Sequence, residues 1–352
     1  MRRTDGLIVG IVGATGMVGR ELIALLESRH FPIAELRPFS SGLSPSSIRF
    51  KGLTVKAPGL STLPLTACDV VFFVSSDAVA RKHAPSLAAR GVWTIDDSAA
   101  FRLIKNIPLV IPEVNAAALR ADRRLISSPN CTMTGLAVAG AVLHRDIGIR
   151  AVRLASYQSV SGAGKAALFE MFSQYSSLSD MRPGHDGRAP VLGAGTSSVL
   201  PRAIAYNAIP QVGRFGADGY SSEETKVAAE LRKIWSAPKL KVSVTAVRVP
   251  SIRGHALAAW LTLARPITLA RARTLLSQTP GLVLSRAGNY PTPRSVGGKN
   301  PVYAGRLRQG LVPTELALWI ASDNLLKGAA LNSVQVAEEL RRRGWLKPRK
   351  GR

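Results

Sequence analysis

Cysteine is scarce in this sequence. Only Cys68 and Cys131 occur among its 352 residues. Two cysteines are too few for a disulfide framework and cannot form a cysteine zinc site on their own, so we expect no metal. They fit a protein of a reducing compartment, and we therefore expect it in the cytoplasm.

Long hydrophobic runs are also missing. The first apolar stretch follows two arginines, but four glycines between Gly10 and Gly19 interrupt it and no A-x-A-like cleavage site closes it. No uninterrupted apolar run elsewhere is long enough to span a bilayer. The sequence therefore argues against a signal peptide and a membrane anchor.

Acidic residues are few: 22 stand against 47 basic residues, which gives a formal net charge of +25. Such a charge raises the question of nucleic-acid binding. The basic residues are spread along the chain, however, apart from clusters at 341–343 and 347–352, and no nucleic-acid motif is present. We expect a solvated basic surface that attracts anionic substrates, and no nucleic-acid partner.

The first part of the chain has the pattern of an α/β fold. A chain of this length suggests two domains. Strand-like runs at 7–12, 68–74, 92–95 and 125–127 alternate with helical stretches such as 17–26. This alternation predicts βαβ units and a parallel sheet, so residues 1–130 are interpreted as a Rossmann-like nucleotide-binding domain.

The pattern changes after Cys131. A small-residue helix is predicted at 132–143, and longer strands at 152–158, 242–249, 256–263 and 316–322. They predict a second α+β domain, 131–323, with a mixed or antiparallel sheet. Residues 176–195 are predicted to form a mobile loop, and 324–343 one long helix that ends at Gly344. We expect this helix to return to the first domain, which then comprises 1–130 plus about 324–352.

A glycine-rich segment, GIVGATGMVG at 10–19, lies where the first strand turns into a helix. Glycines there permit a tight turn and let the backbone approach a pyrophosphate at the helix N-terminus. The alternative is a turn in which glycines only let strand and helix pack closely. The next strand end, PFSSG at 38–42, lacks the carboxylate of NAD sites, which favours NADP.

Cys131 stands at the start of a predicted helix, within SPNCT at 128–132. At this position the helix dipole and free backbone N–H groups stabilise a thiolate and can hold a developing oxyanion. The alternative is a small buried residue, which is the interpretation that suits Cys68 in its apolar strand. We therefore expect Cys131 to be a nucleophile.

A nucleophilic cysteine needs a group that carries protons. Of the five histidines, His255 is the best candidate, because it opens a strand shortly after Arg248 and shares a cationic corner with it. The other four are more typical of helix surfaces or loops.

Many motifs in order together resemble the aspartate-semialdehyde dehydrogenase family, from about residue 7 to residue 340. They are GATGMVG at 13–19, SAAFR at 98–102, IPEVN at 111–115, PNC at 129–131, YQSVSGAG at 157–164, NAIP at 207–210, VRVP at 247–250, RGH at 253–255 and SDNLLKGAALN at 322–332.

The resemblance implies a reaction and a set of site residues. Cys131 would attack β-aspartyl phosphate, NADPH would reduce the resulting thioester, and aspartate semialdehyde would leave. His255 would be the acid/base and Gln158 would orient substrate and nucleophile. The substrate's α-carboxylate and ammonium would be held by Arg248 and Glu223, and its phosphate by Arg102, Asn130 and Lys226. The pathway products would be lysine or diaminopimelate, threonine, methionine and isoleucine. The enzyme would be a homodimer, with a homotetramer as the alternative, and residues 131–323 would be its catalytic and dimerisation domain.

The resemblance also implies the cofactor contacts: Gly13, Ala14, Thr15, Gly16, Met17, Val18, Ser40, Ser41, Ser161, Gly162, Gly164 and Asn324. Two positions depart from the family pattern. Leu43 stands where an arginine usually grips the 2′-phosphate, although Ser44 and Arg49 lie nearby, so NAD remains an alternative to NADP. VSSD at 74–77 replaces a Ser-Ala-Gly run, which changes the expected cofactor contacts there.

Two other functions stay open. N-acetyl-γ-glutamyl-phosphate reductase performs the same chemistry on a longer, acylated substrate, but Glu223, Lys226, Arg248 and His255 favour the aspartyl substrate with its free ammonium. A non-catalytic Rossmann protein, or a basic RNA-associated one, would keep the fold and lose part of the set Cys131, Gln158 and His255.

Overall fold

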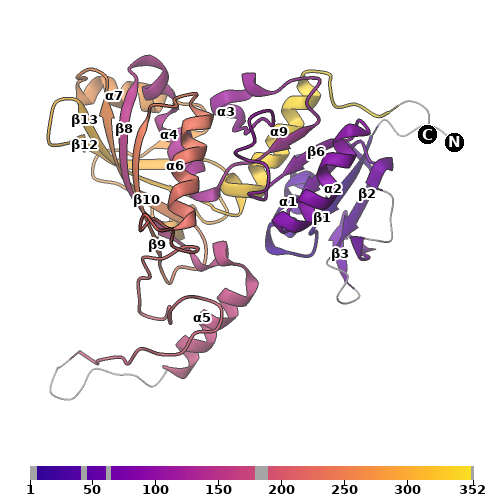
Figure 1. Ribbon diagram of the computed structural model, residues 1–352, viewed down its shortest axis with the longest axis horizontal. Coiled ribbons are helices and arrows are strands. Elements are labelled where there is room, and N and C mark those ends of the chain that lie inside the picture. The colour runs from indigo at the N-terminus through magenta and orange to yellow at the C-terminus, as the bar shows by residue number, and fades with distance from the viewer. Residues whose placement is uncertain (1–5, 41–45, 61–64, 179–188, 350–352) are drawn as a thin grey trace.

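The computed structural model describes residues 6–40, 46–60, 65–178 and 189–349. Figure 1 shows two bodies side by side, each built on its own sheet, with an arm formed by α5 (Lys165–Ser177) projecting from the second. Within the described residues, no helix is long and apolar enough to cross a membrane.

The first sheet has five parallel strands in the order β2-β1-β5-β6-β7. Their bounds are Ile33–Phe39, Leu7–Val12, Val70–Phe73, Trp93–Asp96 and Leu125–Ser127, and the helices α1 (Met17–Ser28) and α2 (Asp77–Ala89) connect them. The predicted Rossmann-like sheet is confirmed. The strand order reverses between β1 and β5, and ligands of such sheets bind at the carboxyl ends of the strands there.

The second sheet has six strands in the order β11-β12-β13-β10-β8-β9. Their bounds are Leu282–Leu284, Val302–Gln309, Glu315–Ser322, His255–Leu263, Ile149–Gln158 and Lys241–Arg248. The β8–β9 and β11–β12 pairs are parallel and the others antiparallel, so the predicted mixed sheet is confirmed. One face is covered by α4 (Cys131–Asp146), α6 (Ser222–Ile234) and α7 (Leu269–Ser277), which form its apolar core.

Several smaller elements complete the chain. A hairpin of β3 (Ser47–Phe50) and β4 (Leu53–Lys56) follows β2. Short helical turns are α3 (Pro112–Asn115) and α8 (Pro293–Val296), with 3-10 turns at Leu65–Ala67, Ala116–Ala118 and Val160–Ala163. The sequence patterns did not predict the hairpin, β11 or β12.

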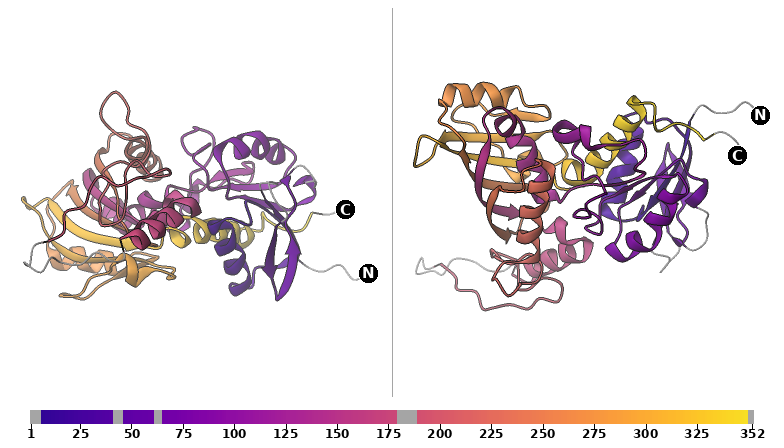
Figure 2. Two further views of the ribbon diagram at one scale, coloured as in Figure 1. Left: turned by 90° about the horizontal axis from the view of Figure 1, so that it is seen from below. Right: turned by 45° about the horizontal axis from the view of Figure 1, so that its top comes forward.

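The prediction of one helix over 324–343 is wrong at its start. The chain first forms a π-helical turn, Leu326–Ala330, and only then the α-helix α9, Leu331–Arg342. Asn324 lies before both, in a buried corner. Helix α9 packs into the core of the first sheet with α1, and both views of Figure 2 place it on that side. We propose on this basis that the C-terminal segment belongs to the first domain.

The predicted loop at 176–195 also begins later than expected, because α5 continues to Ser177. Residues 179–188 lie outside the described part of the chain, and 189–195 form no helix or strand. The following segment returns along α5. Glu170 accepts hydrogen bonds from Ser197, Ser198 and Val199, and these contacts hold the returning segment against α5.

Candidate active site

Cys131 is the first residue of α4, a helix of the second body. Three residues separate it from the end of β7, so it lies near the C-terminal end of the first sheet. Its backbone lies tightly against the π-helical turn: a Cβ added to Gly328 would come within 2.8 Å of the Cys131 Cβ. Only glycine fits this approach. The π-helical turn, an element that often occurs at functional sites, therefore fixes the place of the predicted nucleophile.

Three predicted residues form one row across the second sheet. Gln158 pairs with Arg248 across β8 and β9, and Ala256 pairs with Tyr157, so that His255 follows Gln158 in the same row. All three side chains are buried. Strand alternation places all three side chains on the face that α4 covers. Cys131, the first residue of α4, lies against His255 at one end of the row.

The thiol and the imidazole are in contact. The Cys131 Sγ lies 3.4 Å from the His255 Nε2. Burial lowers the pKa of His255 to about 3, and the nearby Arg248 guanidinium acts in the same direction. The ring is therefore neutral at physiological pH.

In this structure burial opposes the expected stabilisation of a Cys131 thiolate at the helix start. Burial raises the pKa of Cys131 to about 11, the Glu223 carboxylate adds to the increase, and Arg102 and Arg248 oppose it. The first-turn N–H groups of Thr132 and Met133 are also taken, because both donate to the Asn130 Oδ1. Asn130 is thus the N-cap of α4, and these groups do not face an oxyanion.

Glu223 lies beside this N-cap. Its Oε1 accepts a hydrogen bond of 2.9 Å from the Asn130 Nδ2 and one of 3.3 Å from the Thr132 hydroxyl. Lys226 is half-buried one turn further along α6. Among the described residues, Lys226 makes no ion pair.

Arg102 is buried behind the nucleophile, and its three guanidinium nitrogens all donate to the protein. They bind the Ser128 carbonyl at 2.9 Å, the Asp97 carbonyl at 2.6 Å and the Glu230 carboxylate at 3.2 Å. Burial acts to lower the pKa of Arg102, but Glu230 outweighs it and the pKa is raised. The cation is thus held in one orientation, with its charge near Cys131.

Glu230 is a site residue that the sequence patterns missed. It is fully buried, and its Oε2 accepts a 2.7 Å hydrogen bond from the Asn130 N–H in addition to the contact with Arg102. A signal was present: Glu230 follows Glu223 by seven residues, which places both on the same face of a helix. A second carboxylate on the site-facing side of α6 could have been predicted from that spacing.

The glycine loop lies at the C-terminal end of β1. Gly13 has a φ of +93°, and an added Cβ would lie 2.4 Å from the Val74 carbonyl oxygen. Gly16 is the N-cap of α1 and provides no side-chain cap. The first turn of α1 therefore keeps N–H groups for an anionic ligand, as a pyrophosphate site requires. Gly19, in contrast, matches the packing alternative, because its Cβ would strike Gly13 and Ala14.

Other positions considered for the cofactor lie at the end of β2, in the β3–β4 hairpin and directly after β5. Ser40 is buried at the end of β2, whereas Ser41, Leu43 and Ser44 lie outside the described residues. Arg49 donates to the Gly52 carbonyl of its own hairpin. The VSSD segment at 74–77, which departs from the family pattern, borders the glycine loop, because the Val74 carbonyl lies close to Gly13. Ser76 of this segment is the N-cap of α2.

The turn that contains Ser161, Gly162 and Gly164 covers the catalytic row. A Cβ on Gly162 would lie 3.0 Å from the Arg248 Nη1 and 3.2 Å from the His255 Cε1. Asn324 is buried beside this turn and donates to the Ser161 hydroxyl at 3.0 Å. The structure therefore brings Ser161, Gly162 and Asn324 close to His255, whereas a Cβ on Gly164 would have nothing within 4 Å.

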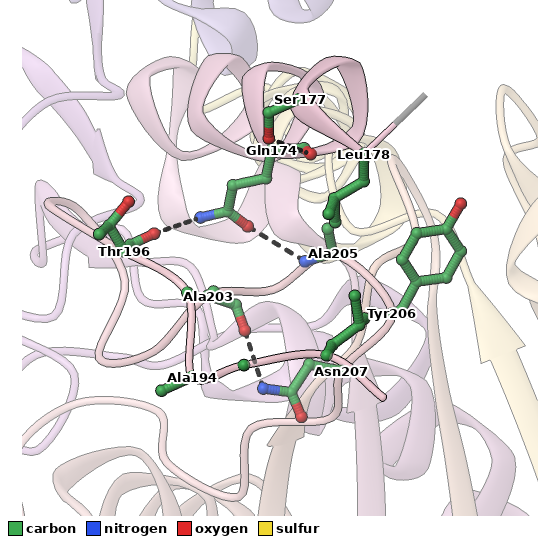
Figure 3. Close-up of a pocket in the computed structure, with 12 residues that line it drawn as sticks. Gln174, Ser177, Leu178, Ala194, Thr196, Ala203, Ala205, Tyr206 and Asn207 are labelled. Atoms are coloured by element: carbon green, nitrogen blue, oxygen red, sulfur yellow. Dashed lines mark hydrogen bonds between the residues drawn. The ribbon is translucent and has the colours of Figure 1, made fainter. Parts of the chain in front are cut away.

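A cavity of about 570 Å³ lies away from these residues, between α5 and the chain segment that returns along it (Figure 3). It is lined by Gln174, Ser177 and Leu178 of α5 and by residues of the returning segment, including Ala203 and Tyr206. None of the predicted site residues lines it. This cavity is therefore separate from the predicted site at Cys131.

The fold and this site are typical of one class: dehydrogenases with a nucleotide-binding domain and a second, mixed-sheet domain, in which a thiol lies against a histidine. Two family models match the chain, "Semialdehyde dehydrogenase, NAD binding domain" over residues 8–121 and "Semialdehyde dehydrogenase, dimerisation domain" over residues 141–327. Aspartate-semialdehyde dehydrogenase of Legionella pneumophila is 38% identical over 350 residues, which are 97% of each chain. That of Streptomyces akiyoshiensis is 40% identical over 336 residues, which are 94% of this chain and 97% of the relative.

Solved structures agree. Aspartate semialdehyde dehydrogenase II of Vibrio cholerae superposes with a TM-score of 0.89 at 36% identity, covering 96% of this chain and 99% of that one. A second structure of the Vibrio cholerae enzyme, complexed with ASA, superposes equally well, with 96% and 98% covered. The chain belongs to the aspartate-semialdehyde dehydrogenase family. The resemblance of the sequence motifs is thereby confirmed, and neither N-acetyl-γ-glutamyl-phosphate reductase nor a non-catalytic Rossmann protein is favoured.

Proposed function

We propose that the protein converts β-aspartyl phosphate to aspartate 4-semialdehyde with NADPH, through a thioester on Cys131. This reaction would serve the biosynthesis of lysine or diaminopimelate, threonine, methionine and isoleucine. The single observation that carries the proposal is the 3.4 Å contact of the Cys131 Sγ with the His255 Nε2, at the end of a buried row that includes Arg248 and Gln158.

The substrate carries a carboxylate and a phosphate, and cations lie on both sides of the thiol. We assign the α-carboxylate to Arg248, because a guanidinium suits two-point binding of a carboxylate. Glu223 would bind the ammonium, while Arg102, Asn130 and Lys226 would bind the phosphate. Arg248 already donates to the Ser159 carbonyl at 2.7 Å, which holds it in place.

Proton handling is assigned to His255, and orientation of substrate and thiol to Gln158. The Gln158 Nε2 donates to the Ser156 hydroxyl at 3.2 Å. This hydrogen bond holds the Gln158 carboxamide along the inner face of β8. Burial of this pair keeps water away from the acyl group once it is attached to the sulfur.

NADP fits the first body. The loop Gly13–Val18 and the first turn of α1 would hold the pyrophosphate, and Ser161, Gly162, Gly164 and Asn324 would lie near the nicotinamide, which supplies a hydride when bound. Ser40 and Ser41 are proposed to face the adenosine ribose. Rates with NADPH and NADH, compared as kcat/KM, test this choice. A clear preference for NADH would overturn it.

We further propose a homodimer formed through the outer face of the second sheet, with a homotetramer of two such dimers as the alternative. Tyr157, Trp260 and Trp319 lie on this face, opposite the helices, and are only partly buried. Light scattering should show a dimer for the wild type and a monomer for Trp260→Glu, at the centre of β10. A dimeric Trp260→Glu would place the interface elsewhere.

The decisive experiment is turnover in the reverse direction. Purified protein should oxidise aspartate semialdehyde with NADP in a phosphate-dependent reaction. The same assay with N-acetylglutamate semialdehyde should give little turnover. Efficient oxidation of the acylated substrate alone would overturn the assignment.

A further inference from the structure

The side of the His255 ring that points away from the thiol is fully engaged. Its Nδ1 accepts a hydrogen bond of 3.1 Å from the Ser159 backbone N–H. The Ser159 hydroxyl lies 3.2 Å from the same nitrogen. Both residues are buried, so no water competes for the Nδ1.

Asn324 holds the two chain segments on either side of this ring. Its Oδ1 accepts hydrogen bonds from the Gly254 N–H at 2.9 Å and from the Ser159 hydroxyl at 3.1 Å. Gly254 directly precedes His255, and Ser159 carries the N–H that binds the ring. One buried carboxamide thus fixes both the backbone of the histidine and the group that it faces.

The direction of these hydrogen bonds determines where the ring carries its proton. A backbone N–H can only donate, so the Nδ1 must be the unprotonated nitrogen. A neutral imidazole then carries its hydrogen on the Nε2, which is the atom 3.4 Å from the Cys131 sulfur. We propose that Ser159 and Asn324 are positioning residues that hold neutral His255 in the Nε2-protonated form, so that it faces the reacting group on Cys131 as a hydrogen-bond donor.

Two further features of the structure agree. A second proton on the Nδ1 would break the bond from the Ser159 N–H, and both burial and the Arg248 guanidinium disfavour a charged ring. Among the described residues, no carboxylate contacts the Nδ1: its neighbours are Ser159 and, through it, Ser161 and Asn324. A carboxylate in that position would have favoured the imidazolium.

This inference rests on the proposed function and refines its first step. In this first step the neutral ring is a hydrogen-bond donor and does not take up the thiol proton, so the proton handling proposed for His255 falls on the later steps of the reaction. The sulfur forms its bond to the acyl carbon, the bond from that carbon to the phosphate oxygen breaks, and the thiol proton leaves on the departing phosphate. Throughout, the Nε2–H donates to the acyl oxygen, where negative charge develops.

The tautomer can be measured directly by nitrogen NMR of histidine-labelled protein, with the His255 signals assigned from their loss in His255→Gln. We expect a protonated Nε2 and an unprotonated Nδ1 from about pH 5 to about pH 9. A protonated Nδ1, or an imidazolium in this range, would overturn the proposal. This readout does not depend on turnover, so it is separate from failure of the proposed function.

Two pairs of variants test the positioning roles. Ser159→Ala keeps the backbone N–H and should keep the tautomer, whereas Asn324→Ala should give a mixture of the two tautomers. In turnover, His255→Gln places an amide N–H near the Nε2 position and His255→Asn near the Nδ1 position. We expect kcat of His255→Gln to exceed that of His255→Asn by about tenfold. Equal losses in both variants would show that donation from the Nε2 is not the function of the ring.

Discussion

Two helices of this protein begin at sites where the sequence predicts an anion, and their N-termini are built in opposite ways. The N-cap of helix α1 is Gly16, which has no side chain to cap the first turn. The N-cap of helix α4 is Asn130, whose side chain accepts from the N–H groups of Thr132 and Met133. The first helix keeps its N–H groups for a ligand, and the second uses two of them within the protein.

The difference separates two ways of building a functional site. At α1 the backbone itself is the binding group, so glycines that leave space are what matter. At α4 we propose that buried side chains carry the chemistry, while the helix start fixes the place of Cys131. The thiol therefore gains little from the capped N–H groups, and the charges that lower its pKa are those of Arg102 and Arg248.

The two cysteines give the largest expected effect. Cys131→Ala removes the nucleophile and should lower kcat by about 10³-fold or more, with little change in stability. Cys68→Ala, in the core of the first sheet, should keep kcat and lower the free energy of unfolding by about 1 kcal/mol. Turnover assays and urea denaturation measure the two effects. Comparable kcat in both variants would contradict a thioester mechanism.

Glu230→Gln tests the side-chain site at α4. The amide can still accept from the Asn130 N–H, but Arg102 loses its buried counter-charge, so we expect a loss of about 3 kcal/mol in the free energy of unfolding. The half-exposed pair Arg29–Glu338 is the control, and Glu338→Gln should cost about 0.5 kcal/mol or less. If Glu230→Gln and Glu338→Gln lost the same free energy of unfolding in urea denaturation, the buried pair would not be important for the fold.

Gly13→Ala tests the backbone site at α1. A Cβ there would meet the Val74 carbonyl at 2.4 Å in addition to the unfavourable φ, so we expect a cost of about 2 kcal/mol and a KM for the cofactor raised about tenfold. Gly52→Ala has a similar φ of +78° and open space around it, and should cost only about 1 kcal/mol, with KM unchanged. KM for the cofactor should therefore differ between the two variants, although the φ angles of Gly13 and Gly52 are similar.

The pH dependence of Cys131 reactivity tests the capped N-terminus. With a pKa of about 11, the thiolate fraction rises with pH, and alkylation by iodoacetamide should accelerate about tenfold for each pH unit between about pH 7 and pH 10. The rate should then level off only as the pH passes the pKa. A plateau near neutral pH would show instead that the helix start stabilises a thiolate after all.

The same contrast explains what could be predicted from the sequence. The parallel sheet and the long strands of the second sheet follow from local apolar patterns, which are properties of the segments themselves. The π-helical turn at 326–330 could not be predicted, because it depends on the fit of Gly328 against Cys131. In the same way, the sequence places Cys131 at a helix start but does not show that Asn130 occupies the N–H groups.

The smallest expected effect comes from making the α1 terminus resemble that of α4. Gly16 has φ −71° and ψ 171°, a conformation that serine adopts readily, and an added Cβ would have only the Gly13 carbonyl within 4 Å, at 3.3 Å. Gly16→Ser should therefore cap the helix and raise the free energy of unfolding by about 0.5 kcal/mol. Because the hydroxyl would compete with the pyrophosphate for the same N–H groups, we expect KM for the cofactor to rise about threefold. Gly16→Ala is the control, since it adds the Cβ without a cap. A rise in KM of the same size in Gly16→Ala would mean that space, and not the free N–H groups, makes this terminus a nucleotide site.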